Sequence, residues 1–163
     1  IYYLATKLKT GLGGMAKERN QTIEFSAPKN ICEIYADRLQ IKRVIFNLLS
    51  NAITYGYKNS TILINIKDEK NEIEFTITNQ SEQIPEKELS TMFKRFKETK
   101  LSYFNKTSTG LGLYLSKKII DMHNGKIFAK SYPDGKCIFG FKLPKTTIPP
   151  ENTDASQIHS QVV

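Results

Sequence analysis

The spacing of hydrophobic residues separates segments typical of strands from segments typical of helices. Alternation of hydrophobic and polar residues predicts strands over 22–27 and 31–36, paired across a short turn. Alternation over 61–68 and 71–79 predicts a hairpin, and a Pro-Asp-Gly turn inside 125–143 predicts another. The predicted strands therefore lie mostly in antiparallel pairs.

Helical spacing marks the segments between those strands. We predict a helix from residue 38 to about 57 with Asp37 as its N-cap, a short helix over 86–96, and a second amphipathic helix over 110–124. The segment 2–17 also has helical character, which we expect to be interrupted at its glycines. This order predicts an α+β fold, a two-layer sandwich in which a mixed, mostly antiparallel sheet is covered on one face by helices.

The same pattern indicates how the chain is divided. Residues 21–145 are expected to form one domain, with 1–20 as the end of an upstream helix or linker and 146–163 as a disordered polar tail. The chain lacks an initial Met, and we expect it to be a piece of a longer protein. The sequence has neither the pattern of a signal peptide nor an apolar run long enough for a membrane helix.

Composition and charge narrow the function classes only a little. Hydrophobic residues make up 39% of the 163 residues and charged residues 25%, as in ordinary globular proteins. Cys32 and Cys137 lack the spacing of a metal site, and we expect buried, reduced thiols in a cytoplasmic domain. The net charge of +8 would suit nucleic acid, but the lysines are scattered, which favours a solvated surface without a nucleic-acid partner.

Two asparagines lie near the edge of the apolar face of the helix predicted after Asp37. Asn51 is at the margin of that face, and Asn47 is one turn earlier and further toward solvent. Spacing alone leaves two interpretations with even weight. In the first, both amides are ordinary solvent-exposed side chains without a function. In the second, Asn51 presents its carbonyl oxygen to a hard cation such as Mg²⁺, which usually also binds substrate phosphates.

Gly110 and Gly112 open the helix predicted over 110–124. A helix start with free N–H groups and no Cβ in the way is a typical anion site. The same glycines alternatively serve only a tight turn that packs the helix on the sheet. A polar loop rich in Lys, Ser and Thr, residues 97–107, runs directly into this helix and is typical of a lid over a ligand.

The strand predicted over 71–79 ends on an asparagine that faces the core. Ile73, Phe75 and Ile77 share one face of this strand, and Asn79 falls on the same face. Burying an amide costs free energy unless the amide finds a hydrogen-bond partner. Hydrophobic packing therefore does not explain this position.

Six segments occur in a fixed order along the chain: N-L-L-S-N-A-I-T-Y, I-T-N-Q-S-E-Q-I-P, M-F-K-R-F, T-G-L-G-L-Y-L-S-K-K-I, H-N-G-K-I and F-G-F-K-L-P. Together they resemble the ATP-binding catalytic domain of sensor histidine kinases, in the superfamily shared with gyrase. The resemblance covers about residues 21–144. The family calls its boxes N, G1, F, G2 and G3, and the N and G2 boxes match best.

The resemblance implies a site for ATP and Mg²⁺. Asn51 would be the metal ligand, Tyr55 would lie near the base and Ile84 would pack on the adenine. Phe93 and Phe96 would anchor the root of the lid. The residues implied in nucleotide binding are Asn47, Asn51, Tyr55, Asn79, Ile84, Arg95, Lys97, Ser108, Thr109, Gly110, Leu111, Gly112 and Leu113.

The G1 box departs from the family pattern. The family has an aspartate at the position of Asn79, where a carboxylate accepts a hydrogen bond from the adenine amino group; an asparagine keeps an acceptor but carries no charge. Ser81 and Gln83 replace two glycines, and the side chain of Gln83 is expected to crowd the nucleotide. Lys97 or Arg95 is the candidate replacement for the arginine that follows the F box.

The resemblance implies transfer of the γ-phosphoryl group of Mg·ATP to a histidine on a separate dimerisation domain, in a homodimeric sensor that signals to a response regulator. Asn47 stands where gyrase-like members carry the carboxylate that activates water, which argues against efficient hydrolysis. His123 is expected to be a structural, helix-terminal residue, and His159 has no helical context. Because of its G1 box, the alternative is a pseudokinase interaction module with weak or no nucleotide binding.

Overall fold

The structure is a computed structural model, and it describes residues 1–30, 33–95 and 110–145. These residues form a five-stranded sheet in the order β1-β2-β3-β5-β4. Its strands are β1 (Thr22–Ser26), β2 (Thr61–Asp68), β3 (Glu72–Gln80), β4 (Lys126–Ser131) and β5 (Lys136–Pro144). β1 runs parallel to β2, and the other neighbouring pairs are antiparallel, which confirms the predicted sheet.

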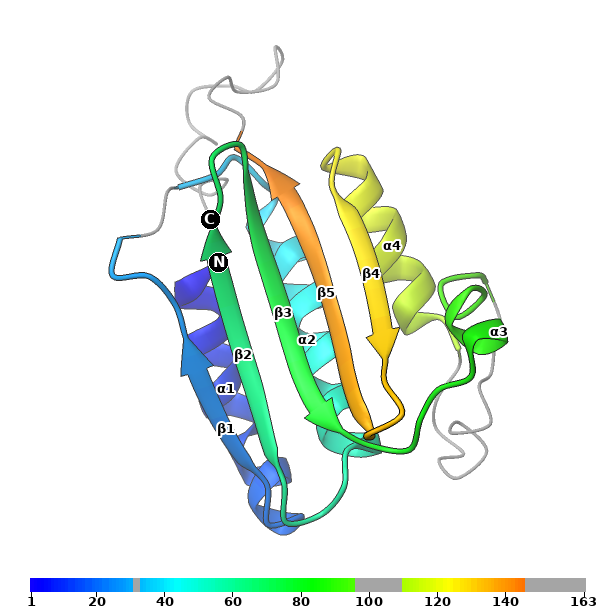
Figure 1. Ribbon diagram of the computed structural model, residues 1–163. Helices are drawn as coiled ribbons and strands as arrows, with labels where there is room; N and C mark the ends of the chain where they lie inside the picture. Colours follow the sequence, from blue (N-terminus) through cyan, green and yellow to red (C-terminus); the bar gives the residue numbers. More distant parts are fainter. Residues whose placement is uncertain (31–32, 96–109, 146–163) are drawn as a thin grey trace.

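Three helices cover one face of this sheet and leave the other face open (Figure 1). They are α1 (Tyr2–Glu18), α2 (Arg38–Tyr55) and α4 (Gly112–Met122), while the short α3 (Glu86–Leu89) lies beside β4. The predicted two-layer α+β sandwich is confirmed. Within the described part of the chain, every helix is too short or too polar to span a bilayer.

α2 is the central helix of the helical layer, and it begins where the sequence predicts. The carboxylate of Asp37 accepts hydrogen bonds from the backbone N–H groups of Leu39 and Gln40, at 2.9 and 3.0 Å, and so caps the helix. The apolar face of α2 is fully buried against the sheet and its neighbouring helices. Its buried residues are Ile41, Val44, Ile45, Leu48, Leu49, Ala52 and Ile53.

The expected interruption of the first helix is wrong, because α1 is continuous from Tyr2 to Glu18. Its side chains at four-residue spacing, Leu4, Leu8, Leu12 and Ala16, all lie in the main hydrophobic core. Tertiary burial of this stripe outweighs the low helix propensity of glycine. α1 packs as part of the same core as α2 and the sheet.

The predicted hairpin between 22–27 and 31–36 is also wrong. β1 pairs with β2 instead, in parallel register, and among residues 33–36 only Tyr35 forms an isolated bridge. Residues 31–32 lie outside the described part of the chain. Ile34 and Ala36 are buried, so the alternation reflects an extended segment that inserts alternate side chains into the core without joining a ladder.

The helix predicted over 86–96 is shorter than expected and ends at Leu89. The hydroxyls of Ser90 and Thr91 donate to the carbonyl of Lys87, at 2.9 and 3.1 Å, and compete with the continuing helix. The two other predicted hairpins and the helix after Gly110 are present, with the helix ending at Met122.

Candidate functional site

The N-terminus of α4 packs directly against the middle of α2, where the sequence placed the phosphates. The amide nitrogen of Asn47 donates to the hydroxyl of Ser116 at 3.0 Å and joins the two helices. A Cβ on Gly112 would lie only 2.3 Å from Oδ1 of Asn47. Glycine at this position is therefore required for the close approach of α4 to the half-buried Asn47.

The first turn of α4 keeps backbone donors without a side-chain cap. Its N-cap residue is Leu111, whose side chain has no capping atom, and Gly110 enters the turn with a φ of +63° that favours glycine. The first N–H groups of a helix have no partner inside the helix and carry its positive dipole end. The described part of this turn thus offers donors to an anion.

Asn79 is buried next to Gly56, the residue that caps the C-terminus of α2. Its side chain faces the core, as the alternation along the strand predicts. Its side chain is only 3% exposed, and Oδ1 has no hydrogen-bond partner among the described residues. Its amide nitrogen lies 3.4 Å from the position of a Cβ on Gly56, the residue that ends α2. The half-buried Tyr55 precedes that glycine, so the two residues predicted near the base belong to the same end of α2.

The G1 segment is held by a small network of hydroxyl and thiol groups. Ser81 is 3% exposed, and its hydroxyl lies 3.1 Å from Sγ of Cys137. The hydroxyl of Ser131 accepts from the backbone N–H of Ile84 at 2.9 Å. Cys137 is a buried free thiol as predicted, whereas Cys32 lies outside the described residues. Gln83 is exposed, whereas Ser81 is buried.

Other predicted residues are placed at the edges of this region. Ile84 packs in a small apolar cluster with Met92 and Cys137, and the half-buried Leu113 contacts both this cluster and the main core. Phe93 also packs against the small cluster, while Asn51 is half-buried and Arg95 exposed. Four further predicted residues lie outside the described part of the chain, as does the expected lid. They are Phe96, Lys97, Ser108 and Thr109.

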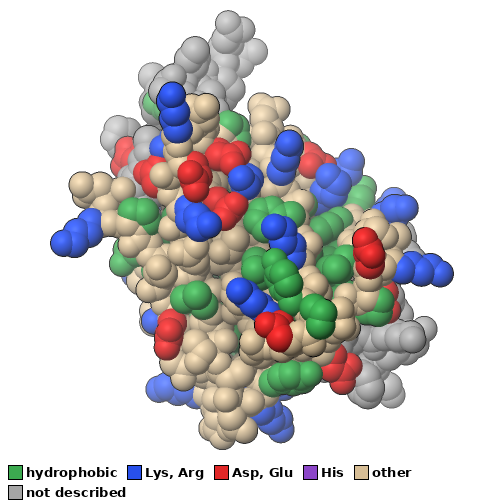
Figure 2. Space-filling model, viewed as in Figure 1, with side chains coloured by type: hydrophobic (Ala, Val, Ile, Leu, Met, Phe, Trp, Pro, Cys, Tyr) green, Lys and Arg blue, Asp and Glu red, His purple; other side chains and the backbone are tan. Residues whose placement is uncertain are grey.

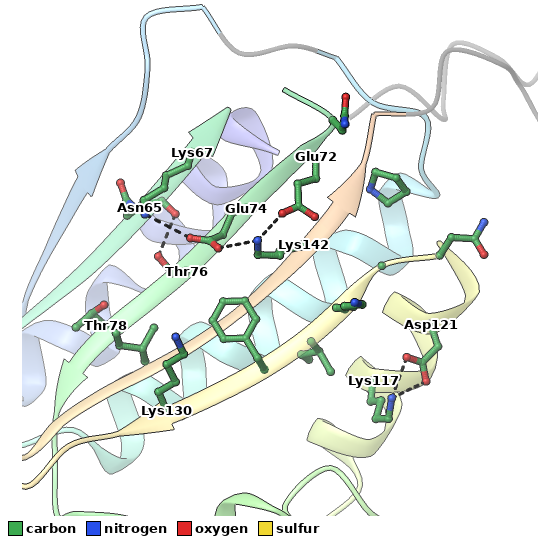
Figure 3. A pocket seen from close by; sticks show the side chains of 18 of the residues that line it. Asn65, Lys67, Glu72, Glu74, Thr76, Thr78, Lys117, Asp121, Lys130 and Lys142 are labelled. Carbon is green, nitrogen blue, oxygen red and sulfur yellow. Dashed lines mark hydrogen bonds and ion pairs between the residues drawn. The ribbon is translucent and has the colours of Figure 1, made fainter. Parts of the chain in front are cut away.

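A groove of about 1110 Å³ lies elsewhere, on the open face of the sheet. Figure 2 shows acidic and basic side chains interspersed on this face. Within the groove, Lys142 pairs with Glu72 and, at 3.4 Å, with Glu74, which also pairs with Lys67 at 3.7 Å (Figure 3). The hydrogen bond with Glu72 raises the pKa of Lys142. The groove is lined by five lysines and three carboxylates, and the ion pairs within it offset part of the positive charge.

His123 has a structural role, as its position at the end of α4 predicts. Its Nε2 accepts a hydrogen bond from the backbone N–H of Asp37 at 2.9 Å, and its Nδ1 lies 2.7 Å from the carbonyl oxygen of Ile119. Both ring nitrogens are therefore used to tie the end of α4 to the start of α2. Sequence reasoning missed Ser116, which is one turn after Gly112 on the face that meets Asn47.

Comparison with known proteins identifies the family. The family model for histidine kinase-, DNA gyrase B- and HSP90-like ATPases matches residues 36–147. The chain belongs to this family. It is 36% identical over 129 residues to the sensor protein KdpD of Clostridium acetobutylicum, an alignment that covers 78% of this chain and 14% of KdpD. The chain thus spans about a seventh of that relative's length.

Solved structures of this family agree with the fold. The nucleotide-free catalytic domain of the histidine kinase ThkA has a TM-score of 0.79 and 30% identity, covering 89% of this chain and 94% of that domain. ThkA in complex with the response regulator protein TrrA has a TM-score of 0.76 and 28% identity, covering 90% of this chain and 40% of ThkA. The protein is a histidine kinase-type ATP-binding domain.

Proposed function

We propose that this domain binds Mg·ATP along α2, with the base at Asn79 and the phosphates at the first turn of α4. The observation that carries the proposal is the buried Oδ1 of Asn79, an acceptor that lacks a partner among the described residues. A buried acceptor without a partner costs about 1–3 kcal/mol, and an amino group of a bound base would offset that cost. The uncapped first turn of α4 supports the phosphate end.

The residues of the chain act by binding and orienting. Asn79 accepts a hydrogen bond from the amino group of the base. The backbone N–H groups after Gly110 bind phosphate oxygens, and Asn51 presents its amide oxygen to Mg²⁺. ATP supplies the phosphoryl group, and the metal offsets its charge. In phosphoryl transfer, positioning and charge neutralisation account for most of the catalysis, so this domain needs no nucleophile of its own.

The acceptor and the partners belong to the longer protein. We infer a histidine on an upstream dimerisation domain as the acceptor, a homodimeric parent protein and a response regulator as the next receiver. Two facts support this: the chain spans a small part of its sensor relatives, and ThkA assembles with TrrA. When this domain and Mg·ATP are added to a separately purified dimerisation domain, the histidine of the dimerisation domain should become phosphorylated.

Calorimetric titration with ATP, with and without Mg²⁺, tests the proposed site. We expect binding that depends on Mg²⁺ and that weakens at least tenfold in Asn51→Ala, because one metal ligand is lost. Asn71→Ala is the matched control, since Asn71 is an exposed asparagine at the tip of the β2–β3 hairpin. Equal affinities for Asn51→Ala and the wild type would show that the nucleotide site is wrongly assigned.

A second candidate is an interaction module with weak or no nucleotide binding. The specific observation in its favour is Ser81, a buried side chain where the family has a glycine, held by its bond with Cys137. Absence of binding heat and of any thermal shift at millimolar ATP would favour this candidate. Asn79→Asp combined with Ser81→Gly would then be expected to restore binding.

A further inference from the structure

The groove on the open face of the sheet reaches the point where the described chain ends. Pro144, the last residue of β5, lines the groove together with Glu72, its register partner on β3. The backbone N–H of Lys145 donates to the carbonyl of Asn71 at 2.9 Å and fixes the chain at this rim. The residues that follow Lys145 therefore start beside the groove.

The floor of the groove contains an aromatic ring that lies on the sheet. Phe128 of β4 pairs with Gly140 of β5, which pairs in turn with Thr76 of β3. A Cβ on Gly140 would lie 2.8 Å from Cζ of Phe128 and 2.8 Å from Cγ2 of Thr76, so the ring occupies the space above the glycine. Phe128 is only half-buried there, and a segment bound in the groove would cover the rest of its apolar surface.

Two exposed lysines flank this ring and lack an ion-pair partner among the described residues. Lys126 and Lys130 lie two positions before and two positions after Phe128, on the same face of β4. The other lysines of the groove are engaged by its carboxylates, in the pairs Lys67–Glu74, Lys117–Asp121, Lys142–Glu72 and Lys142–Glu74 (Figure 3). The positive charge that remains in the groove is therefore that of Lys126 and Lys130.

The segment after Lys145 has the complementary charge. Residues 146–163 lie outside the described part of the chain, and their sequence contains neither Lys nor Arg. Their acidic side chains are Glu151 and Asp154. A polyanion such as nucleic acid would also meet the carboxylates of the groove, whereas two carboxylates match the two unpaired lysines alone.

The order of the lysines along the groove suits a chain that turns back from the end of β5. Lys126 lies opposite Lys142, two residues before Pro144. Lys130 lies opposite Ile138, six residues before Pro144. A segment that reverses after β5 thus passes Lys126 first and Lys130 second.

The spacing of the charges agrees with this direction. At about 3.3 Å per residue, Lys126 and Lys130 are about 13 Å apart along β4, and Glu151 and Asp154 are up to about 10 Å apart in an extended chain. Long lysine side chains span the difference. Residues 146–150 precede Glu151, and a connection of about 4–6 residues is long enough to reverse a chain.

We propose that residues 146–163 dock into the groove of the same chain, with Glu151 beside Lys126 and Asp154 beside Lys130. The backbone between the two carboxylates crosses the ring of Phe128. An exposed ion pair changes a population by a factor of about five at most. It is sufficient here because a short tether supplies an effective concentration on the order of millimolar. The inference is independent of the proposed nucleotide site.

Carbodiimide cross-linking of the whole chain, read by mass spectrometry, tests the docking because it joins carboxylates to lysine amines that are in contact. We expect Glu151 and Asp154 to join Lys126 and Lys130 about fivefold more often than Lys70. Lys70 is the matched control, since it is exposed and adjoins Asn71 at the rim but does not line the groove. The preference should disappear at 1 M NaCl, where the Debye length is about 3 Å.

Mixing ¹⁵N-labelled and unlabelled chains separates docking within one chain from docking between two copies. Cross-linked peptides in which both halves carry the same isotope support the proposal. Peptides that combine the two isotopes as often as random pairing allows would overturn it in favour of a second copy. Cross-links to Lys70 as frequent as those to Lys126 and Lys130 would show that the segment does not dock.

A nuclear magnetic resonance measurement gives a second readout that leaves the folded domain unaltered. Glu151→Gln combined with Asp154→Asn removes both charges from the segment. We expect the backbone amide resonances of Phe128 and Gly140 to shift at low salt and to stay in place at 1 M NaCl, where the segment is already released. Resonances of Phe128 and Gly140 that are identical in the wild type and this variant at low salt would contradict the docking.

Discussion

At the scale of single residues, the contact between Gly112 and Asn47 makes the sharpest prediction. A methyl group at residue 112 would lie 2.3 Å from Oδ1 of Asn47 and would force that side chain away from its bond with Ser116. We expect Gly112→Ala to lower the free energy of unfolding by about 1 kcal/mol, despite the better helix propensity of alanine. Urea unfolding measures the change.

Gly14→Ala is the matched control for this prediction. Gly14 lies inside α1, and a Cβ there would meet no other atom within 4 Å. Alanine should therefore stabilise the domain by about 0.5–1 kcal/mol at this position. In an Asn47→Ala background the penalty of Gly112→Ala should also disappear, because the colliding amide is gone. A penalty that persists there would mean that another contact limits residue 112.

The residues of the site differ in how far the sequence alone could predict them. The inward position of Asn79 follows from the two-residue period of a strand, which is a local rule. The role of Gln21 does not follow from any local rule, because its partners are carbonyls 32 and 36 residues away at the end of α2. Only the fold brings the α1–β1 junction to that helix end.

At the scale of elements, the junction between α2 and α4 depends on Asp37 and His123. Asp37 caps α2 with its carboxylate and donates its own backbone N–H to His123. The hydrogen bond from the backbone of Gln40 lowers the pKa of Asp37 below its usual value of 3.8. The folded state therefore favours the charged carboxylate.

The sign of this shift predicts how Asp37 affects stability as pH changes. A lowered folded-state pKa adds stability that is fully present above about pH 4 and is lost as pH falls through the folded value. We expect the wild type to be more stable than Asp37→Asn at pH 7, with a difference that shrinks at pH 3. Asp37→Ala should cost about 0.5–2 kcal/mol at pH 7, because the cap itself is lost. Parallel urea curves at both pH values measure these differences, and a constant difference would contradict the charge effect.

Elements whose own residues carry a strong helix or strand signal were predicted well. Elements whose extent or pairing depends on competition between alternative hydrogen-bond partners were not. α2 has both a capping residue and a continuous apolar face, so its start and its buried side agree with the sequence. α3 ends early because the hydroxyls of Ser90 and Thr91 donate hydrogen bonds to the backbone carbonyl of Lys87, which a continuing helix would use. β1 pairs with a strand from a later part of the chain, and the choice of strand partner is decided by the whole sheet rather than by β1 itself.

At the scale of the whole molecule, α1 belongs to the same hydrophobic core as the sheet. Five of its side chains are buried: Leu4, Ala5, Leu8, Leu12 and Ala16. α1 ends at the junction that carries Arg19 and Gln21. The side chains of these two residues donate hydrogen bonds to the carbonyls of Ile53, Gly56 and Tyr57, at and just beyond the end of α2. A helix that leads into this domain is thus connected through a few hydrogen bonds to the end of α2 where the base is proposed to bind.

This shared core predicts that a chain beginning at residue 21 does not fold cooperatively. Burying a Leu side chain contributes about 1.5–3 kcal/mol, so losing the Leu residues of α1 removes much of a typical stability of about 5–15 kcal/mol. A chain of residues 21–163 should show no sigmoidal thermal transition by circular dichroism. As graded variants of the full chain, Leu8→Ala should cost about 2–5 kcal/mol and the exposed control Thr10→Ala less than about 0.5 kcal/mol. If 21–163 melts at the same temperature as the full chain, α1 is a separable linker, and its side chains contribute nothing to holding the end of α2.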